Sequence, residues 1–458
     1  MCDFRDITLD DRSLVESYTF RAGIANCDLA FANIFCWRDT YSPALAIIDG
    51  FLVIRFRAED GCTSYMQPLG EGDFTRIIPV LHDDACARGA RLRIAGLTVE
   101  GAELLRSRFG GRFAFSARRA SDDYIYRADD LRSLHGSRYQ PKRNHINRFM
   151  QLYGDLWRYD ELTPELFGEC MRLEAQWSLG HSGDGVTAER RAMEQAFANF
   201  GALGLRGGCI HVGDRMAAFT LGSAIDRSTF CIHIEKADTC FEGAFAVINK
   251  LFAESLPAHY TSINREEDLG LEGLRRAKLS YHPERLWRKF TAVSLQPDES
   301  ECRSLWAECF GDDEEFIDSF IVEIYSRERM LTIVEDGRMV SMLHIIPMQS
   351  RYGRTAYIYG VATAAGFRRR GHAGRLLQRA VERVDSEGYD AAILIPAGGS
   401  LCSFYSRYGF SDAGLPVVFA GDFDFGTGAA DLDRAMVRMR GGAAFDGDSS
   451  TLECTFAG

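Results

Sequence analysis

Three hairpin signals recur along this chain, and they restrict its fold more than any other feature. Each consists of two apolar runs joined by a short turn, in residues 44–56, 208–223 and 331–346. The turns are Asp49-Gly50, Gly213-Asp214 and Asp336-Gly337. Gly and Asp favour tight hairpins because they tolerate left-handed backbone. More strand-like sequence and an amphipathic helix follow each hairpin, which predicts three tandem α/β domains, each a mixed, mostly antiparallel sheet flanked by helices.

The length fits this organisation. The chain has 458 residues, and a domain has about 100–200. We place one boundary near residue 140 and the other in the polar, proline-containing segment 295–301. The expected domains are residues 1–140, 141–294 and 296–458. Residues 411–450 are rich in Gly and Asp, so we expect loops there and a last strand at 451–456.

Composition limits the partners and the location. The net charge is −12, which argues against a basic coat for duplex DNA and still allows a local basic groove. No run approaches 18 apolar residues, so no membrane span is expected. The first residues carry acids where a signal peptide needs a basic region. We therefore expect a cytoplasmic protein.

The thirteen cysteines point to a reducing compartment. They are scattered, odd in number and form no CxxC pair, so we expect buried thiols and no metal. Two Cys/His pairs, Cys209/His211 and Cys231/His233, each fall on one face of a predicted strand. We interpret both pairs as core or rim residues of a sheet.

The clearest chemistry lies in residues 356–380, AYIYGVATAAGFRRRGHAGRLLQRA. A strand is predicted up to Thr363 and a helix from about His372, with Arg368-Arg369-Arg370-Gly371 between them. Backbone N–H groups at a helix start bind phosphate oxygens, and flanking arginines add charge-assisted hydrogen bonds. A pyrophosphate is the natural ligand of such a loop. The alternative is a solvated basic run that caps a helix.

Residues 390–410 supply a second element. A buried strand at 391–395 leads through Gly398-Gly399 to Ser400, which we expect to cap a short helix. That helix is predicted to end at Tyr408-Gly409-Phe410.

These two segments resemble the GNAT superfamily of acyl-CoA-dependent N-acyltransferases, and within it the enhanced-intracellular-survival type, over about residues 300–415. Arg368-x-x-Gly371-x-Ala373 matches the family's pyrophosphate signature, and Phe404-Tyr405-x-x-x-Gly409-Phe410 matches its second motif. One departure is Ala365, where the family often has proline; binding should not suffer.

The resemblance implies acetyl-CoA, or another acyl-CoA, as cosubstrate, and Tyr405 as proton donor to the leaving thiolate. The expected cofactor-binding residues are Val361, Ala362, Thr363, Arg368, Arg369, Arg370, Gly371, His372, Ala373, Gly374 and Ser400. The general base is less defined, because the matching strand offers Tyr357 and Tyr359 instead of a carboxylate. His344 is a candidate; the alternatives are an ordinary strand histidine at that position and a chain of water molecules.

Residues 138–155 and 263–290 carry a different resemblance. The blocks KRNHIN and NREEDLGLEGLRRAKLSYHP are similar to the soluble bacterial relatives of the catalytic domain of phosphatidylglycerol lysyltransferase. The similarity covers about residues 1–292 and implies two tandem GNAT-like lobes. Well-studied members move an aminoacyl group from charged tRNA to a lipid, but the family name does not fix the substrate.

The charges of these blocks can be interpreted in two ways. Basic residues such as Lys142, Arg143, His145 and Arg148 could line a groove for a phosphate-bearing ligand. The acids and bases from Arg265 to Lys289 could instead form a buried ion-pair network that fastens the two lobes. Residues 236–250 lack the arginine signature, so this lobe is not expected to bind acyl-CoA in the usual manner. Gly243, Asn249 and Lys250 are further candidate contacts.

We therefore expect an acyl-CoA-dependent N-acyltransferase that acylates a primary amine through its C-terminal domain. The N-terminal lobes would bind substrate or catalyse a second transfer. The alternatives are an aminoacyl-tRNA-dependent transferase centred on residues 1–292 and a non-catalytic acyl-CoA sensor. Expected partners are a small-molecule or peptide amine and, for the first alternative, charged tRNA, with no DNA. The sequence does not specify the acceptor or the oligomeric state.

Overall fold

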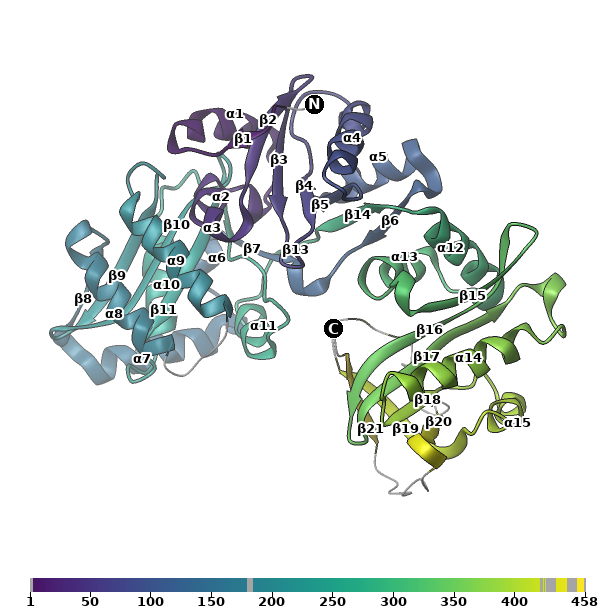
Figure 1. The fold of residues 1–458 in the computed structure, drawn as a ribbon. Coiled ribbons are helices and arrows are strands. Elements are labelled where there is room, and N and C mark those ends of the chain that lie inside the picture. The colour runs from purple at the N-terminus through teal and green to yellow at the C-terminus, as the bar shows by residue number, and fades with distance from the viewer. Residues whose placement is uncertain are drawn as a thin grey trace. The chain divides into compact units, whose positions relative to one another are not determined.

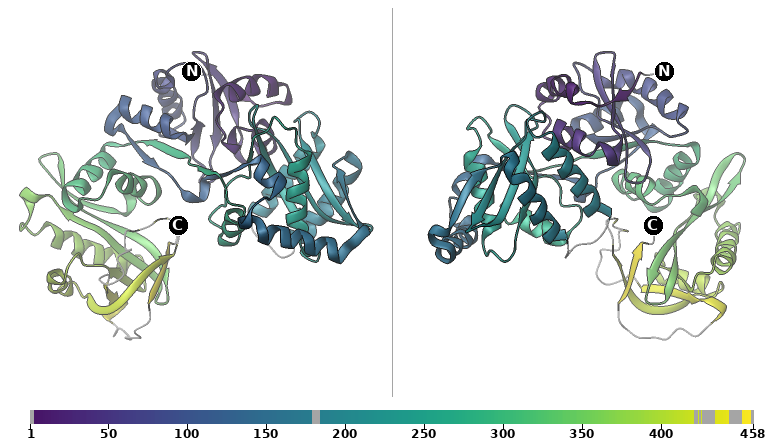
Figure 2. Two further views of the ribbon diagram at one scale, coloured as in Figure 1. Left: turned by 180° about the vertical axis from the view of Figure 1, so that it is seen from behind. Right: turned by 60° about the vertical axis from the view of Figure 1, so that its left-hand side comes forward.

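The computed structural model describes residues 3–178, 184–420, 423, 425, 434–442 and 451–456. Their strands form three sheets flanked by helices (Figures 1 and 2), which confirms the predicted fold class. The chain divides into two compact units. Unit 1 comprises Met1–Arg108 and Ala117–Ala292, and unit 2 comprises Phe109–Ser116 and Val293–Gly458. The division into three consecutive domains does not anticipate that Phe109–Ser116 belongs to unit 2.

The first lobe of unit 1 contains five strands in the order β1-β2-β3-β4-β5. They are β1 (Arg5–Asp6), β2 (Ala44–Ile48), β3 (Phe51–Arg57), β4 (Thr63–Met66) and β5 (Arg93–Leu97). Its helices are α1 (Arg12–Ala22), α2 (Phe31–Cys36), α3 (Arg38–Tyr41), α4 (Ile78–Ala87) and α5 (Val99–Phe109). The predicted hairpin is present between β2 and β3, and both turn residues are left-handed, with φ of +48° at Asp49 and +80° at Gly50.

The second lobe has the strand order β13-β7-β12-β11-β10-β9-β8. The strands are β7 (Asp123–Arg127), β8 (Trp157–Glu161), β9 (Arg206–Val212), β10 (Arg215–Ala224), β11 (Thr229–Ala237), β12 (Ser262–Asn264) and β13 (Arg285–Trp287), and β14 (Phe290–Ser294) follows. The helices are α6 (Ala128–Ser133), α7 (Gln140–Tyr153), α8 (Phe167–Ser178), α9 (Asp184–Ala198), α10 (Ala244–Ser255) and α11 (Glu272–Leu279). The chain enters this sheet at β7, earlier than the expected boundary near residue 140.

The two faces of this second sheet are covered by different helices. Ile210 packs with Val247 and Ile248 of α10 on one face. Cys209, its neighbour on β9, packs with Leu173 of α8 and Met193 of α9 on the other. This alternation is the period of two expected of a strand buried on both sides.

Unit 2 has the strand order β15-β16-β17-β18-β20-β19-β21. The strands are β15 (Met330–Glu335), β16 (Arg338–Ser350), β17 (Gly353–Thr363), β18 (Ala391–Leu394), β19 (Ser411–Ala420), β20 (Arg434–Met439) and β21 (Leu452–Phe456), and β6 (Phe113–Ser116) also lies in this unit. The helices are α12 (Pro297–Phe310), α13 (Glu314–Glu323), α14 (His372–Ser386) and α15 (Cys402–Ser406). Helix α14 packs on β15, β16 and β17 (Figure 1).

The expectation of loops throughout 411–450 is wrong for two segments. Residues 411–420 form β19 and residues 434–439 form β20, which pair with each other. The reason is apolar content within a Gly- and Asp-rich region, since Val417, Ala435, Met436 and Val437 are buried. The predicted last strand is present as β21. The remaining part of that prediction, residues 421–422, 424, 426–433 and 443–450, lies outside the described residues.

Across the described part of the chain, no helix is both long enough and apolar enough to cross a membrane.

Candidate functional site

Residues 364–371, here called the arginine loop, join β17 to α14 in unit 2. After β17 ends at Thr363, a short 3-10 turn covers Ala365–Phe367, and α14 begins at His372 with Gly371 as its N-cap. Gly371 has φ +82°, and Arg369 is left-handed too, with φ +64°. Left-handed residues within a short loop turn successive N–H groups toward one side, which forms an anion-binding concavity. A left-handed arginine is strained backbone of the kind that often marks a ligand site.

The loop arginines are exposed, and two of them also brace the loop. Arg368 donates from Nε to the Thr363 carbonyl at 3.1 Å. Arg370 donates to the Gly366 carbonyl at 3.0 Å and lies 3.6 Å from the Glu335 carboxylate. Both guanidiniums keep further N–H groups, so bracing the loop does not prevent them from binding a phosphate.

His372 and Gly374 have packing roles. The His372 side chain is buried, with Nε2 3.3 Å from Glu335 and Nδ1 2.6 Å from an Arg375 nitrogen. Its side chain is therefore enclosed, and only its backbone N–H can face a ligand at the helix start. A Cβ at position 374 would lie 2.3 Å from the Tyr408 hydroxyl, so glycine lets the Tyr408 side chain pack against the first turn of α14.

Among the described residues, nothing pairs with one edge of strand β17 near the loop. Its parallel pairing with β18 covers Thr355–Tyr357, whereas its pairing with β16 continues to Thr363. A bulge falls at Gly360 and Val361, because Met342 pairs with Ala362 and His344 with Tyr359. Ala362 and Thr363 follow this bulge, which bends the strand. An edge of this kind can accept an extended ligand by strand addition.

Tyr405 lies beside these elements. It is 7% exposed and packs in one hydrophobic cluster with Leu376 and Leu377 of α14 and Val361 of β17. Burial raises the pKa of Tyr405, so the phenol keeps its proton at neutral pH. The structure thus brings Tyr405, the arginine loop and the end of β17 into one region.

Ser400 is exposed and lies in a 3-10 turn, Gly399–Leu401. The expectation that Ser400 caps the following helix is wrong. That helix, α15, begins at Cys402 and has Leu401 as its N-cap. The 3-10 turn shifts the helix start by two residues, which sequence rules for caps do not resolve.

His344 lies in the core of unit 2. It is 1% exposed and its ring contacts Trp306, Phe320 and Tyr325. Burial lowers the pKa of His344 to about 3. An enclosed imidazole of such low basicity is poorly suited to take a proton from an amine, which agrees with the alternative of an ordinary strand histidine.

Burial of His344 should make the protein less stable in acid. The pKa is about 3 in the folded state and near 6.5 in an unfolded chain. Between these values only the unfolded state binds the proton, so the free energy of unfolding falls as the pH falls below 6.5. This group should contribute a loss of about 2 kcal/mol between pH 7.5 and pH 5. Urea denaturation at both pH values should show a smaller loss for His344→Gln, and equal losses would contradict this assignment.

Unit 1 contains a buried ionic cluster where its two lobes meet. The Lys289 ammonium is 2.8 Å from Asp123, 3.2 Å from Asp28 and 3.7 Å from Glu267. The Lys278 ammonium donates to the carbonyls of Arg265 and Glu267. Of the two interpretations of residues 265–289, the structure shows the buried ion-pair network.

The other candidate contacts of this lobe also have structural partners. Lys142 lies over the Tyr281 ring, and burial lowers its pKa to about 8. Arg143 donates to the carbonyls of Leu134 and Gly136, and Arg148 pairs with Glu242. His145 is exposed on α7.

The candidates near α10 are also engaged within the lobe. A Cβ on Gly243 would meet the His145 carbonyl at 2.4 Å. Asn249 donates to Glu235, and Lys250 pairs with Glu254.

A hydrogen-bonded chain of three side chains borders this cluster. Ser223 Oγ is 2.8 Å from His233 Nε2, and His233 Nδ1 is 2.9 Å from Glu266 Oε1. Asn33 donates to the same carboxylate oxygen at 2.8 Å. If His233 donates from Nδ1 to Glu266, its Nε2 accepts from the Ser223 hydroxyl, an arrangement that can activate a hydroxyl.

Opposing effects act on the pKa of the Glu266 carboxyl. Burial is the largest single effect and raises the pKa, but the hydrogen bonds from His233 and Asn33 and the nearby positive charges of His233 and Lys278 together lower it below its usual value. The Glu266 backbone is left-handed, with φ +55°. The sequence did not predict this hydrogen-bonded set of side chains, because its members come from β10, β11 and the segment after β12. The NREED block was the one sequence motif that pointed to this part of the lobe.

Comparisons with known proteins agree with this architecture. A family model described as "Phosphatidylglycerol lysyltransferase, C-terminal" matches residues 21–293, and one described as "Acetyltransferase (GNAT) domain" matches residues 295–413. A search of curated proteins finds no match. A conserved protein of unknown function from Bacteroides thetaiotaomicron is 43% identical, with a TM-score of 0.62, over 64% of this chain and 100% of that one.

Two further solved structures are similar at low identity. One is L-PGS from Bacillus licheniformis, 14% identical with a TM-score of 0.45, over 62% of this chain and 92% of that one. The other is a GNAT family N-acetyltransferase from Escherichia coli in complex with CoA, 14% identical with a TM-score of 0.28, over 36% of this chain and 86% of that one.

Proposed function

Because the chain belongs to the family of the phosphatidylglycerol lysyltransferase C-terminal domain and carries a GNAT acetyltransferase domain after it, we propose that unit 2 is an acyl-CoA-dependent N-acyltransferase that moves an acetyl group, or another acyl group, to a primary amine. The observation that carries this proposal is the loop before α14. Two left-handed residues, Arg369 and Gly371, lie at the start of α14 beside exposed guanidiniums. A pyrophosphate is the chemistry that such a loop recognises best.

The loop and the adjacent strand would bind different parts of the ligand. Backbone N–H groups from Arg370 to Ala373, with the side chains of Arg368, Arg369 and Arg370, would hold the phosphates. The open edge of β17 at Val361–Thr363 would hold the pantetheine arm by main-chain hydrogen bonds. This arrangement would leave the acyl end of the ligand near Tyr405.

The bound acyl-CoA supplies a reactive thioester carbonyl. An amine with an ordinary pKa near 10.4 is mostly protonated at neutral pH and must lose a proton before it attacks. His344 is enclosed, so we propose that water carries this proton to solvent. Tyr405 keeps its own proton and can donate a hydrogen bond, or the proton, to the sulfur as the bond to the acyl carbon breaks.

The test is thiol release from acetyl-CoA by the full chain, with a panel of primary amines that includes polyamines, amino sugars and lysine- or N-terminal-amine peptides. We expect amine-dependent thiol release for at least one class. Tight acetyl-CoA binding without thiol release from any amine would favour the sensor alternative.

A second candidate function rests on the hydrogen-bonded side chains of Ser223, His233 and Glu266. This arrangement favours a separate acyl-transfer centre in unit 1, and an aminoacyl group from charged tRNA is the donor we propose. Filter binding of charged tRNA should weaken steeply with added salt, and Ser223→Ala should abolish transfer to a nucleophile. Ser280→Ala is the control, because Ser280 is exposed on the same unit. Absent or salt-insensitive binding would remove this candidate.

A further inference from the structure

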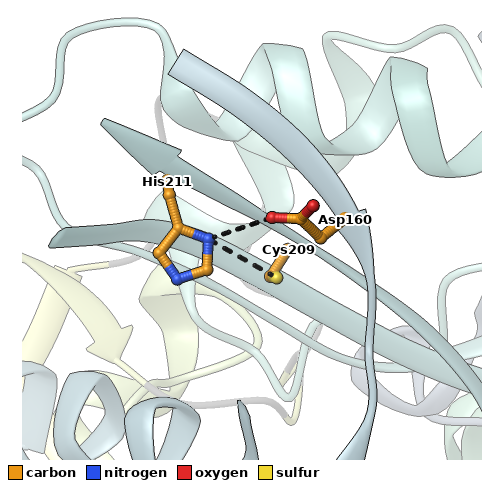
Figure 3. Close-up of side chains that lie close together, drawn as sticks. All are labelled: Asp160, Cys209 and His211. Carbon is orange, nitrogen blue, oxygen red and sulfur yellow. Dashed lines mark hydrogen bonds and ion pairs between the residues drawn. The ribbon is translucent and has the colours of Figure 1, made fainter. Parts of the chain in front are cut away.

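Three potential metal ligands gather on one face of β8 and β9, in unit 1. Cys209 and His211 alternate on β9, and Asp160 of β8 pairs directly with Cys209 in the register. His211 Nδ1 is 3.4 Å from Asp160 Oδ2 and 3.9 Å from Cys209 Sγ. Figure 3 shows the imidazole turned toward both groups. Since the three ligand atoms lie within 4.8 Å of one another, one ion could touch them all.

These separations are close to those in a tetrahedral zinc site. Zinc binds sulfur at about 2.3 Å, imidazole nitrogen at about 2.0–2.1 Å and carboxylate oxygen at about 2.0–2.2 Å. Tetrahedral angles then place S and N about 3.6 Å apart and N and O about 3.4 Å apart. The observed 3.9 Å and 3.4 Å need only small side-chain shifts.

The surroundings hold two of the ligands in orientation. Glu169 of α8 lies 3.1 Å from His211 Nε2, on the far side of the ring from Cys209 and Asp160. A carboxylate in that place fixes the tautomer in which Nε2 carries the proton and Nδ1 is free to bind a metal. Arg158 donates to Asp160 Oδ2 at 2.9 Å, and this oxygen, which is also the one nearest His211 Nδ1, keeps a second lone pair for a metal.

We propose that Asp160, Cys209 and His211 bind a divalent transition-metal ion, and that zinc is the metal this mixed S, N and O set suits best. Cys209 and His211 are buried, whereas 40% of the Asp160 side chain is exposed. Three protein ligands beside solvent leave a fourth position for water, as in catalytic rather than structural zinc sites. The site is independent of the acyl-CoA site of unit 2.

Two other clusters in unit 1 are less suitable. Cys27, Asp123 and Glu267 already surround the Lys289 ammonium, which supplies the cation there. Around Cys231 and Glu266, both nitrogens of His233 are engaged, by Ser223 and by Glu266.

Metal binding here should release protons. The metal binds the thiolate, so the S–H proton must leave to solvent when the metal–sulfur bond forms. The heat of binding should therefore depend on the ionisation enthalpy of the buffer.

The experiment uses the full chain after chelator treatment and dialysis, titrated with Zn(II) in two buffers and with Co(II) in the spectrophotometer. We expect one equivalent of Zn(II), proton release, and a thiolate-to-cobalt charge-transfer band. Cys209→Ser should abolish the band. Asp160→Asn, at a partly exposed position, and Glu169→Gln should weaken Zn(II) binding by about 10–100-fold.

Two control variants separate this site from adventitious binding. Cys86→Ser removes an exposed pair in which the thiol is 3.7 Å from His82 Nδ1, and Cys231→Ser removes the thiol of the neighbouring cluster. Both should keep the band and the affinity. A wild-type protein without the band, a band that survives Cys209→Ser, or a band lost in either control would overturn the proposal. If Cys209→Ser does not fold, unchanged affinity in both Asp160→Asn and Glu169→Gln would also overturn it.

Discussion

Replacing Lys289 by methionine should lower the free energy of unfolding of unit 1 by about 3–5 kcal/mol. The Lys289 ammonium is buried, and it is the cation shared by Asp123, Asp28 and Glu267. Methionine can fill the space of the lysine stem, but it leaves the fully buried Asp123 carboxylate without its counter-charge. Uncompensated buried charge is among the most destabilising changes a single substitution makes.

Urea denaturation at pH 7.5 measures this loss, and Lys250→Met is the matched control. Lys250 pairs with Glu254 one helical turn away on α10, where the Glu254 side chain is 42% exposed. Such a pair contributes only about 0.2–0.5 kcal/mol. Equal losses in the two variants would contradict the view that the cluster around Lys289 holds the two lobes of unit 1 together.

Replacing Tyr405 by phenylalanine should lower kcat for amine acylation by about 100-fold or more, with little change in KM for acetyl-CoA. The substitution removes the hydroxyl but keeps the ring that packs against Leu376, Leu377 and Val361. A hydrogen-bond donor to the leaving sulfur acts as the charge develops, so its loss affects kcat more than binding.

Tyr389→Phe is the control, because Tyr389 is 4% exposed and belongs to the same hydrophobic cluster. Loss of the Tyr389 hydroxyl should leave kcat within about two-fold of the wild-type value, because Tyr389 lies on the segment after α14 and away from the arginine loop. A Tyr405→Phe protein with the kcat of the wild type would exclude Tyr405 as the donor.

Local rules predicted the parts of the fold that depend on a few neighbouring residues. The Asp49-Gly50 and Asp336-Gly337 turns adopt the left-handed backbone that identifies hairpins. Helix α14 begins at His372, as the change from strand-like to helical spacing indicates. In both places the signal and the structure it specifies lie within one short segment.

Features built from distant segments could not be predicted in this way. Phe109–Ser116 joins unit 2 because the Phe115 N–H donates to Asp318, which Arg303 also binds, and nothing near residue 115 indicates this. His233 finds Ser223 and Glu266 only once β10, β11 and β12 are aligned. Cys209 and His211 are buried, as predicted for core or rim residues, but nothing in the sequence indicates that Asp160 and Glu169 reach them from other elements.

The resemblance to GNAT enzymes located the arginine loop, but the structure divided its residues by role. Arg369 and Gly371 supply the left-handed backbone, whereas His372 and Gly374 serve packing. Sequence spacing alone places these residues in the loop and the first turn of α14, and it cannot distinguish a side chain that faces a ligand from one that faces the core.

The most direct measurement is a calorimetric titration of the full chain with acetyl-CoA, beside the double variant Arg368→Ala/Arg370→Ala and the control Arg383→Ala. Arg383 lies at the far end of α14 and pairs with Glu387. We predict micromolar binding by the wild type and the control, and at least a ten-fold loss in the double variant, since each charge-assisted hydrogen bond contributes about 1.5–3 kcal/mol. No binding by the wild type, or equal affinity in all three proteins, would contradict an acyl-CoA site at this loop.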